Sequence, residues 1–160
     1  MEKNNRFAQL LLSLYGELLE EENLETALAG SLELLVSALK SEAGAIWLLD
    51  RDTNRLVPMF HMGPVDLSNF SVEMGTGAES YVTRTGESLC LNSPAEDTRF
   101  SGTLLDENGL PVQSMICVPL NNLHQIVGCL QIVNKKDGPY AEDELRLCER
   151  MAALEVTVVV

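Results

Sequence analysis

The stretch from Ser114 to Glu144 determines the fold of this chain. It reads SMICVPL, then a polar NNLHQ connector, then IVGCLQIVNK, and passes a Gly138-Pro139 break before AEDE. Two apolar, β-branched runs joined by a short polar connector predict a β-hairpin. Consecutive apolar residues in both runs predict central strands that are covered on both faces. After the break the apolar spacing becomes helical, so we expect a helix from about Ala141.

Composition limits the function classes that fit the chain. With 160 residues it is expected to form one domain, with a helical extension. A net charge of −13 argues against a nucleic acid or an anionic membrane as partner, because both require clustered Lys and Arg. No apolar run approaches the ~20 residues of a membrane-spanning helix and no signal peptide is evident, so a cytoplasmic protein is expected. The four cysteines lack CxxC or zinc-type spacing; we expect buried thiols, no metal and no cofactor.

Two helices are predicted before the first strand. Residues 6–22 carry an apolar stripe at alternating steps of three and four, typical of an amphipathic helix. We assign residues 1–22 to a signalling or dimerisation helix, although its apolar face can equally well pack on its own domain. Residues 24–40 form the second helix, preceded by Asn23 as a candidate N-cap. The domain proper is therefore expected over residues 23–160.

The remaining segments predict a layered α+β fold. A short helix is expected over residues 78–84, and residues 92–112 are long and weakly periodic, as in a binding loop or lid. Together these segments predict a central antiparallel sheet of about six strands, with the terminal helices on one face and the short helix and lid on the other. A cavity would lie between the sheet and the lid. The strands predicted outside the hairpin are 43–50, 55–61, 70–73 and 88–91.

Several motifs in this order resemble those of a GAF domain, the small-molecule sensor module related to PAS domains. They are GAIWLLD (44–50), MGTGAESYVTRTGESL (74–89), DTRF (97–100) and the two strands of the hairpin. The resemblance covers about Leu24 to Ala153. It implies regulatory binding, in which a small ligand held under the lid acts through the flanking helices on a fused effector. No catalytic output module is recognisable in the sequence.

Six residues are candidates for ligand binding. Gly77 ends a Gly-Thr-Gly turn before the short helix, which can either present backbone N–H groups to an anion or simply require positive φ. Arg99 in the lid can pair with a ligand carboxylate or phosphate, or with an acidic neighbour such as Asp97. The resemblance places the others around the pocket: Glu79 and Tyr81 from the helix, Ser114 and Cys117 from the strand that forms its floor.

A second resemblance concerns the cyclic-nucleotide-binding GAF domains of phosphodiesterases and adenylyl cyclases. Those domains carry Asn-Lys, then an aromatic residue, and then an acidic pair after a fixed interval. Here Asn134 and Lys135 are present, Tyr140 takes the aromatic position, and Asp143 follows one residue early. The resemblance implies a structural lock in which Lys135 pairs with Asp143 and ties strand to helix. It does not establish a nucleotide ligand.

The best-known enzymes with this fold, free-methionine sulfoxide reductases, require a thiolate nucleophile and resolving cysteines on the pocket helix and lid. The helix reads Gly-Ala-Glu-Ser and residues 92–113 hold no cysteine, while Cys90 and Cys117 lie outside those segments. We therefore expect a non-catalytic regulatory domain of a bacterial-type signalling chain. It would be homodimeric through its terminal helices, with an unknown small ligand and a downstream effector. The alternatives are a ligand-free dimerisation scaffold, a cyclic-nucleotide sensor and an enzyme similar to the free-methionine sulfoxide reductases.

Overall fold

The computed structural model of this chain describes residues 24–75, 77–97, 111–122 and 125–159, together with the isolated residues Gln9 and Gly16. The predicted helix over residues 6–22 and most of the predicted lid, including Arg99, lie outside the described residues. The elements are α2 (Leu24–Ala38), β1 (Ser41–Asp50), β2 (Arg55–Met62), β3 (Val72–Glu73), α3 (Gly77–Thr85), β4 (Leu89–Leu91), the 3-10 helix η1 (Pro94–Glu96), β5 (Met115–Asn121), β6 (Ile126–Lys135) and α4 (Glu142–Val159).

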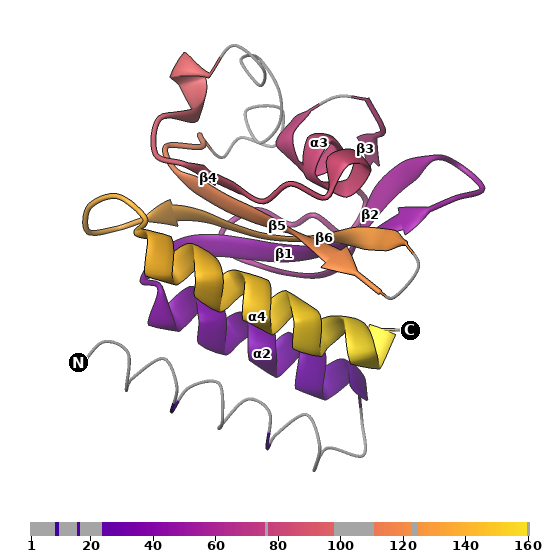
Figure 1. Ribbon diagram of the computed structural model, residues 1–160, viewed down its shortest axis with the longest axis horizontal. Coiled ribbons are helices and arrows are strands. Elements are labelled where there is room, and N and C mark those ends of the chain that lie inside the picture. The colour runs from indigo at the N-terminus through magenta and orange to yellow at the C-terminus, as the bar shows by residue number, and fades with distance from the viewer. Residues whose placement is uncertain are drawn as a thin grey trace.

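The six strands form one sheet in the order β3-β2-β1-β6-β5-β4, with every neighbouring pair antiparallel (Figure 1). The predicted hairpin is confirmed as β5–β6. Its connector is closed by Asn122, whose N–H donates to the Gln125 carbonyl (3.0 Å) and whose Oδ1 accepts the Gln125 N–H (2.8 Å). The longest strands, β1 and β6, lie next to each other at the centre of the sheet. This arrangement confirms the predicted α+β class.

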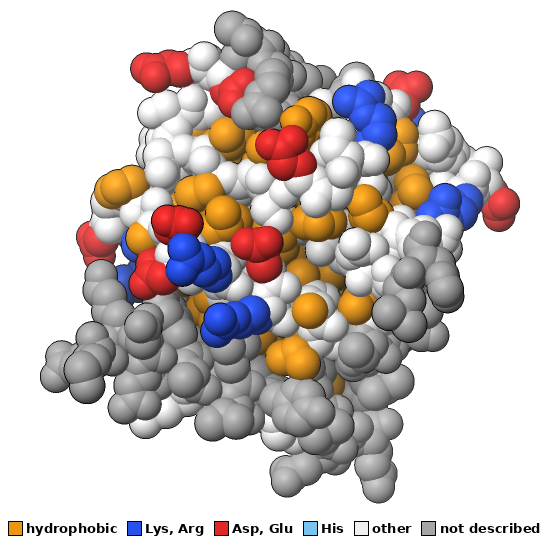
Figure 2. All heavy atoms as spheres, in the orientation of Figure 1, with side chains coloured by type: hydrophobic (Ala, Val, Ile, Leu, Met, Phe, Trp, Pro, Cys, Tyr) orange, Lys and Arg blue, Asp and Glu red, His pale blue; other side chains and the backbone are white. Residues whose placement is uncertain are grey.

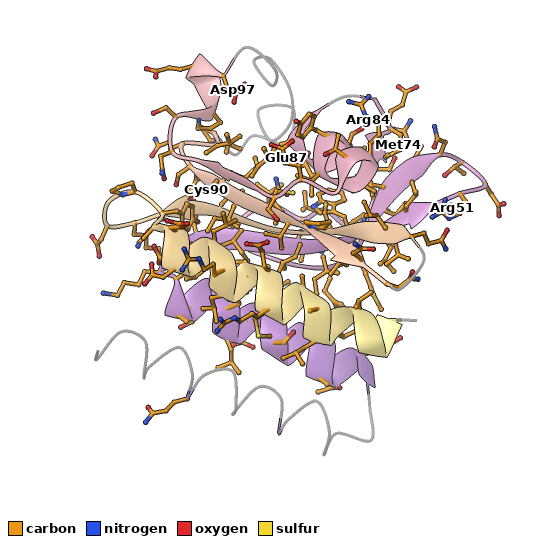
Figure 3. All side chains as sticks on the ribbon, in the orientation of Figure 1. Arg51, Met74, Arg84, Glu87, Cys90 and Asp97 are labelled. Carbon is orange, nitrogen blue, oxygen red and sulfur yellow. The ribbon has the colours of Figure 1, made fainter. Side chains whose placement is uncertain are left out.

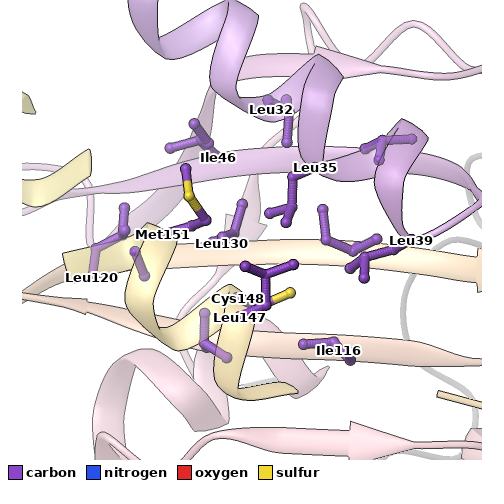
Figure 4. Packing of buried hydrophobic residues seen from close by; sticks show 14 of the residues in the cluster. Leu32, Leu35, Leu39, Ile46, Ile116, Leu120, Leu130, Leu147, Cys148 and Met151 are labelled. Atoms are coloured by element: carbon purple, nitrogen blue, oxygen red, sulfur yellow. The ribbon is translucent and has the colours of Figure 1, made fainter. Parts of the chain in front are cut away.

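Helices α2 and α4 lie side by side on one face of the sheet (Figure 1). Their apolar stripes interdigitate with alternate side chains of the central strands, and together they form the larger hydrophobic core (Figure 4). Burial of each large aliphatic side chain contributes roughly 1.5–3 kcal/mol. The fully or almost fully buried members include Leu32, Leu35 and Leu39 of α2, Leu147 and Met151 of α4, and Ile46, Ile116 and Leu130 of the strands.

Helix α3 covers the opposite face, where it packs mainly on β5 and β6. Successive side chains of a strand point to opposite faces, so the residues beside those of the larger core form a second core here. Its members include Trp47 of β1, Cys117 of β5 and Cys129 of β6, each no more than 1% exposed. The predicted placement of the short helix opposite the terminal helix is therefore confirmed.

One glycine of β6 permits a close approach between the backbones of β6 and β1. Gly128 of β6 pairs with Leu48, and a Cβ atom added at Gly128 would lie 1.9 Å from the backbone oxygen of Trp47. The register of β1 against β2 also shifts between Ile46 and Trp47. Only a residue without a side chain lets the two central strands approach this closely at the irregularity.

The surface of the described residues exposes little large apolar area. Val57 of β2, 37% exposed, is the one large hydrophobic side chain among them that counts as exposed. On the face in Figure 2, acidic and basic side chains lie intermixed between small hydrophobic groups. Within the described part of the chain, none of the helices combines the length and hydropathy needed to cross a bilayer.

Candidate functional site

The candidate site lies between the sheet and α3 and centres on Gln131. This residue interrupts the otherwise apolar middle of β6, where it pairs with Ala45 on one side and Cys117 on the other. Its side chain points toward α3 and is only 2% exposed. A buried amide must find hydrogen-bond partners, because an unpaired one costs about 1–3 kcal/mol. The partners come from elements far away in the sequence.

Gln131 links Trp47 to Glu79 in a chain of hydrogen bonds, called the Glu79 chain below. The indole N–H of Trp47 donates to Gln131 Oε1 (3.0 Å), and Gln131 Nε2 donates to Glu79 Oε1 (2.7 Å). The same amide nitrogen lies 3.6 Å from the sulfur of Met115. Trp47 and Glu79 are 1% and 0% exposed, so the whole chain is shielded from solvent.

The hydrogen bonding of the Glu79 carboxyl is incomplete. Its Oε2 is buried and has no hydrogen-bond partner among the described residues, and the same is true of Thr83 Oγ1, one helical turn further along α3. Burial raises the pKa of Glu79 from 4.5 to about 7, against the opposing effects of its own backbone N–H and of Gln131. No positively charged side chain of the described residues contributes to this shift. The site therefore holds a carboxyl group that is close to half protonated near neutral pH and retains one free acceptor oxygen.

A small pocket adjoins Gln131 on the side away from α4. Its volume is about 20 Å³, close to what one water molecule requires. Apart from Gln131, the side chains that line it are apolar and come from β1, β2, β6 and the connection after β2; they include Ala43, Ala45, Met62, Leu67 and Val133. Side chains of the described residues thus fill most of the space between the sheet and its cover at this point.

The Gly-Thr-Gly turn sets the start of α3. Gly75 and Gly77 have φ angles of +106° and +80°, in the region that favours glycine. The Gly75 N–H donates to Ser80 Oγ (2.5 Å). Glu79 lies in the first turn of the helix, and its carboxyl accepts a hydrogen bond from the backbone N–H of the same residue. The turn and these internal contacts account for the motif, so the structure favours the turn interpretation over anion binding.

The structure brings together only some of the predicted ligand-binding residues. Glu79 and Cys117 lie at the buried site, and burial raises the pKa of the Cys117 thiol well above its usual range, with a further contribution from Cys129. Tyr81 directs its hydroxyl to the exposed carboxylate of Glu87 (2.7 Å), at the surface. Ser114 is buried, but its Oγ accepts a hydrogen bond from the backbone N–H of Lys135 (3.0 Å). This side chain therefore takes part in the pairing of β5 with β6.

Trp47, Gln131 and Thr83 were not predicted from the sequence as site residues. A signal for Gln131 was available, because it is the one polar side chain within the run from Ile126 to Val133. A polar residue in a strand that is buried on both faces needs a buried partner. Nothing comparable marks Trp47 or Thr83, whose roles depend on which elements face each other.

Asn134 fastens the end of the predicted lid to the sheet. It has a φ of +62°, its Nδ2 donates to the Pro111 carbonyl (2.8 Å) and to Glu42 Oε2 (3.0 Å), and its Oδ1 accepts the Gln113 N–H (2.7 Å). Its backbone N–H also donates to the Ser114 carbonyl (2.8 Å). Asparagine tolerates this left-handed backbone, and its short amide can reach all of these groups.

The predicted ion pair between strand and helix exists, but its partner requires correction. Lys135 Nζ lies 2.5 Å from Glu144 Oε1, not at Asp143. The Asp143 carboxylate instead accepts the backbone N–H of Glu144 (3.1 Å). Glu144 is 7% exposed and lies one turn before the buried Cys148, so it is on the side of α4 that faces the sheet. Its Oε1 also accepts the Ala141 N–H (2.9 Å) at the helix start.

A second asparagine holds the beginning of the predicted lid at the same end of α4. Asn92 Oδ1 accepts the Tyr140 N–H (2.8 Å), and Asn92 Nδ2 donates to the Tyr140 carbonyl (3.2 Å). The Tyr140 hydroxyl forms a 2.6 Å hydrogen bond with Ser41 Oγ. Cys90, on β4, also lies near the Tyr140 carbonyl (3.9 Å; Figure 3). Both ends of the predicted lid are thus bonded close to where α4 begins.

The architecture of the sheet and helices, together with the motifs that they carry, defines the class of protein. The family model of the GAF domain matches residues 23–157, and this chain belongs to that family. Among curated proteins, the chain is 31% identical over 72 residues to "Probable 3',5'-cyclic phosphodiesterase pde-5" of Caenorhabditis elegans, covering 45% of this chain and 10% of that protein. It is 33% identical over 70 residues to "Dual 3',5'-cyclic-AMP and -GMP phosphodiesterase 11A" of Takifugu rubripes, covering 42% and 8%. The matches span a tenth or less of these relatives.

Solved structures share the fold at low identity. The GAF domain of a phosphoenolpyruvate-protein phosphotransferase from Coxiella burnetii has a TM-score of 0.86 at 20% identity, with 96% of this chain and 92% of that one covered. The free methionine-R-sulfoxide reductase of Neisseria meningitidis, solved with its substrate, has a TM-score of 0.83 at 16% identity, with 99% and 90% covered. Regulatory modules and enzymes therefore share this fold, and the function has to be argued from the site.

Proposed function

We propose that this chain is a non-catalytic regulatory domain that binds a small ligand between the sheet and α3. Membership of the GAF family supports a regulatory or sensory role. The observation that carries the ligand-binding part is the Glu79 chain. A buried carboxyl group with a free oxygen and no cation costs stability, and such groups are concentrated at functional sites.

The contacts around Asn92, Asn134 and Lys135 support a route from the site to the helices. Both ends of the predicted lid are bonded next to the start of α4, and Lys135 joins β6 to Glu144 on that helix. A ligand that alters the position of the lid therefore changes groups in direct contact with α4. In this proposal α4 and the N-terminal helix transmit the change to an effector in the same signalling chain.

The proposed context follows from the same features. The domain acts as a homodimer through its terminal helices, in the cytoplasm of a bacterial-type signalling system, without a nucleic acid or membrane partner. The net charge of −13 supports the exclusion of nucleic acid and membrane partners, since nucleic acids and anionic membranes both repel an acidic protein. Sedimentation of the purified chain over a range of concentrations tests the homodimer, and a monomer at every concentration would reject it.

Two other functions have specific support. The small volume of the pocket favours a scaffold whose interior is filled by its own side chains. The names of the phosphodiesterase relatives favour a 3',5'-cyclic nucleotide. Calorimetric titration with cyclic AMP and cyclic GMP tests the nucleotide, and absence of heat at high micromolar concentration would reject it.

The state of the thiols supports a non-catalytic role over sulfoxide reduction. A thiolate is the nucleophile in that chemistry, and reactive cysteines have lowered pKa values. Here desolvation raises the pKa of both Cys90 and Cys117. An assay of the reduced protein with free methionine sulfoxide and a thiol reductant should therefore detect no turnover.

Mass spectrometry under native and then denaturing conditions tests the proposal directly. With protein purified from its expression host, we expect a non-covalent small-molecule adduct that is lost on denaturation and whose mass identifies the ligand. A Glu79→Gln variant prepared in parallel should lose the adduct, and the exposed Glu87→Gln variant should retain it. A dimer that remains free of adduct when incubated with extract of the host would favour the scaffold.

A further inference from the structure

We propose that the site takes a small ligand with a positively charged N–H donor group, an ammonium or an amidinium, and that this group pairs with Glu79. The inference rests on the proposed ligand-binding function and names the chemical class of the ligand. It follows from the acceptors and charges around Glu79 and from the apolar lining of the adjoining pocket.

The free acceptors at the site define what the ligand must provide. Glu79 Oε1 already accepts a hydrogen bond from Gln131 Nε2. Glu79 Oε2 and Thr83 Oγ1 are both buried and have no partner within the part of the chain that the structure describes. The two residues are four apart on α3, so their side chains lie on the same face of the helix. These two oxygens lie on one helix face and leave acceptor capacity free, which a ligand that donates hydrogen bonds would use; the Thr83 hydroxyl can also donate.

The charges around Glu79 favour a cationic ligand over an anionic one. Among the residues that the structure describes, no lysine or arginine contributes to the Glu79 pKa, and no basic side chain lines the pocket. The N-terminal end of α3, which would otherwise favour an anion, already faces the Glu79 carboxyl. An anionic ligand would be repelled by ionised Glu79, whereas a cation would supply the missing countercharge and form charge-assisted hydrogen bonds.

The pocket limits the size and polarity of the rest of the ligand. Gln131 connects the pocket to Glu79 through a single 2.7 Å hydrogen bond, and the other lining side chains are apolar. The pocket volume of about 20 Å³ accommodates one group of the size of water. A small cationic head that carries at most a methyl-sized apolar group fits this volume better than a nucleotide.

Binding of such a cation must release a proton from Glu79. Near neutral pH part of the Glu79 population is protonated, and only the ionised form attracts the cation. Affinity should therefore rise roughly tenfold per pH unit below the pKa of Glu79, and level off above it. On β5, the buried Cys117 thiol interacts electrostatically with Glu79, and its raised pKa keeps this thiol neutral over the same range.

Three small molecules of matched shape test the inference: acetamidinium, acetamide and acetate. Trp47 is the one tryptophan in the chain and donates to Gln131, so its indole N–H gives a single NMR signal that reports on the site. We expect acetamidinium to shift this signal in a saturable way, at least about tenfold more tightly than acetamide, with no response to acetate. Calorimetry in two buffers of different ionisation enthalpy should detect the released proton.

Two variants make the test specific. Glu79→Gln should reduce the affinity for acetamidinium by about tenfold or more and abolish proton release, whereas the exposed Glu87→Gln should leave both unchanged. Equal affinity of the cation and its neutral isostere, or no saturable shift with any of the three, would overturn the inference. A host-derived adduct that is neutral or anionic would also overturn it, while leaving the proposed ligand-binding function intact.

Discussion

Replacing Glu79 by glutamine should stabilise this domain at about pH 8 and have little effect at about pH 5. The substitution keeps the shape of the side chain and an oxygen that can accept from Gln131, while it removes the ability to ionise. A protonated carboxyl and an amide both leave one buried polar group without a partner, so they should be similar in cost. The difference between the two proteins therefore reports the cost of the buried charge.

The magnitude follows from the pKa. In the folded protein the pKa of Glu79 is raised from 4.5 to about 7, mainly by desolvation. Between these values the folded state binds more protons than the unfolded state, so stability falls as pH rises through this window. A shift of about 2.5 units corresponds to about 3 kcal/mol at 1.36 kcal/mol per unit. That amount is fully lost above about pH 8, and the variant should regain it.

Urea unfolding at a series of pH values measures the effect. The change in environment of Trp47, the single tryptophan, reports unfolding by fluorescence. Comparing variant with wild type cancels most of the background repulsion that arises from the net charge of −13. In the folded wild type, the NMR signal of the Trp47 indole N–H should also change with pH, with a midpoint near pH 7, because Gln131 links this group to Glu79. The change should be absent in Glu79→Gln.

The matched control is Glu87→Gln, the same chemical change at an exposed glutamate in the segment between α3 and β4 (Figure 3). Its effect on stability should remain within about 0.5 kcal/mol at every pH. A pH-independent difference between wild type and Glu79→Gln would refute the assignment of Glu79 as a desolvated, chargeable group. The same assignment would be refuted if the NMR signal of the Trp47 indole N–H still changed with pH, with a midpoint near pH 7, in Glu79→Gln.

Two further predictions concern the fold and the strand-to-helix contact. Gly128→Ala should destabilise the domain by several kcal/mol or prevent folding, because the new Cβ would overlap the backbone of β1. Gly30→Ala, in an open helical position, should instead stabilise the domain by up to about 1 kcal/mol. Thermal unfolding of both variants measures the difference. A double-mutant cycle between Lys135→Met and Glu144→Gln should give a coupling energy of about 1–3 kcal/mol, and the cycle with Asp143→Asn should give less than about 0.5 kcal/mol. Equal coupling in both cycles would contradict the corrected ion pair.

The candidate site could be predicted from the sequence only in part. Glu79 and Cys117 were identified through the resemblance to GAF domains, which places the short helix and the first strand of the hairpin around the pocket. Gln131 and Trp47 were missed, although they complete the hydrogen-bond chain to Glu79. Their contacts join residues 52 and 84 positions apart in the sequence, and no local pattern contains that information.

The pairing of Lys135 illustrates a smaller failure of the same kind. The spacing of the motif pointed to Asp143, one residue before the observed partner Glu144. On a helix, adjacent residues point about 100° apart, so a single position decides whether a carboxylate faces the sheet or the solvent. The exact start and rotation of α4 are set by how its apolar side packs, with Leu147 and Cys148 buried against the sheet.

The sequence by itself determined the class of fold. Apolar periodicity, glycine positions and the polar connector specify each strand and helix locally, and the need to bury their apolar faces leaves few arrangements of the layers. Only the tertiary structure decided which polar groups meet inside. The strand parity of β1 and β6 and the register between them place Trp47 and Gln131 on one face, and the packing of α3 brings Glu79 to them. The unpaired charge at this site, and the ligand chemistry it implies, therefore arise from contacts between distant segments.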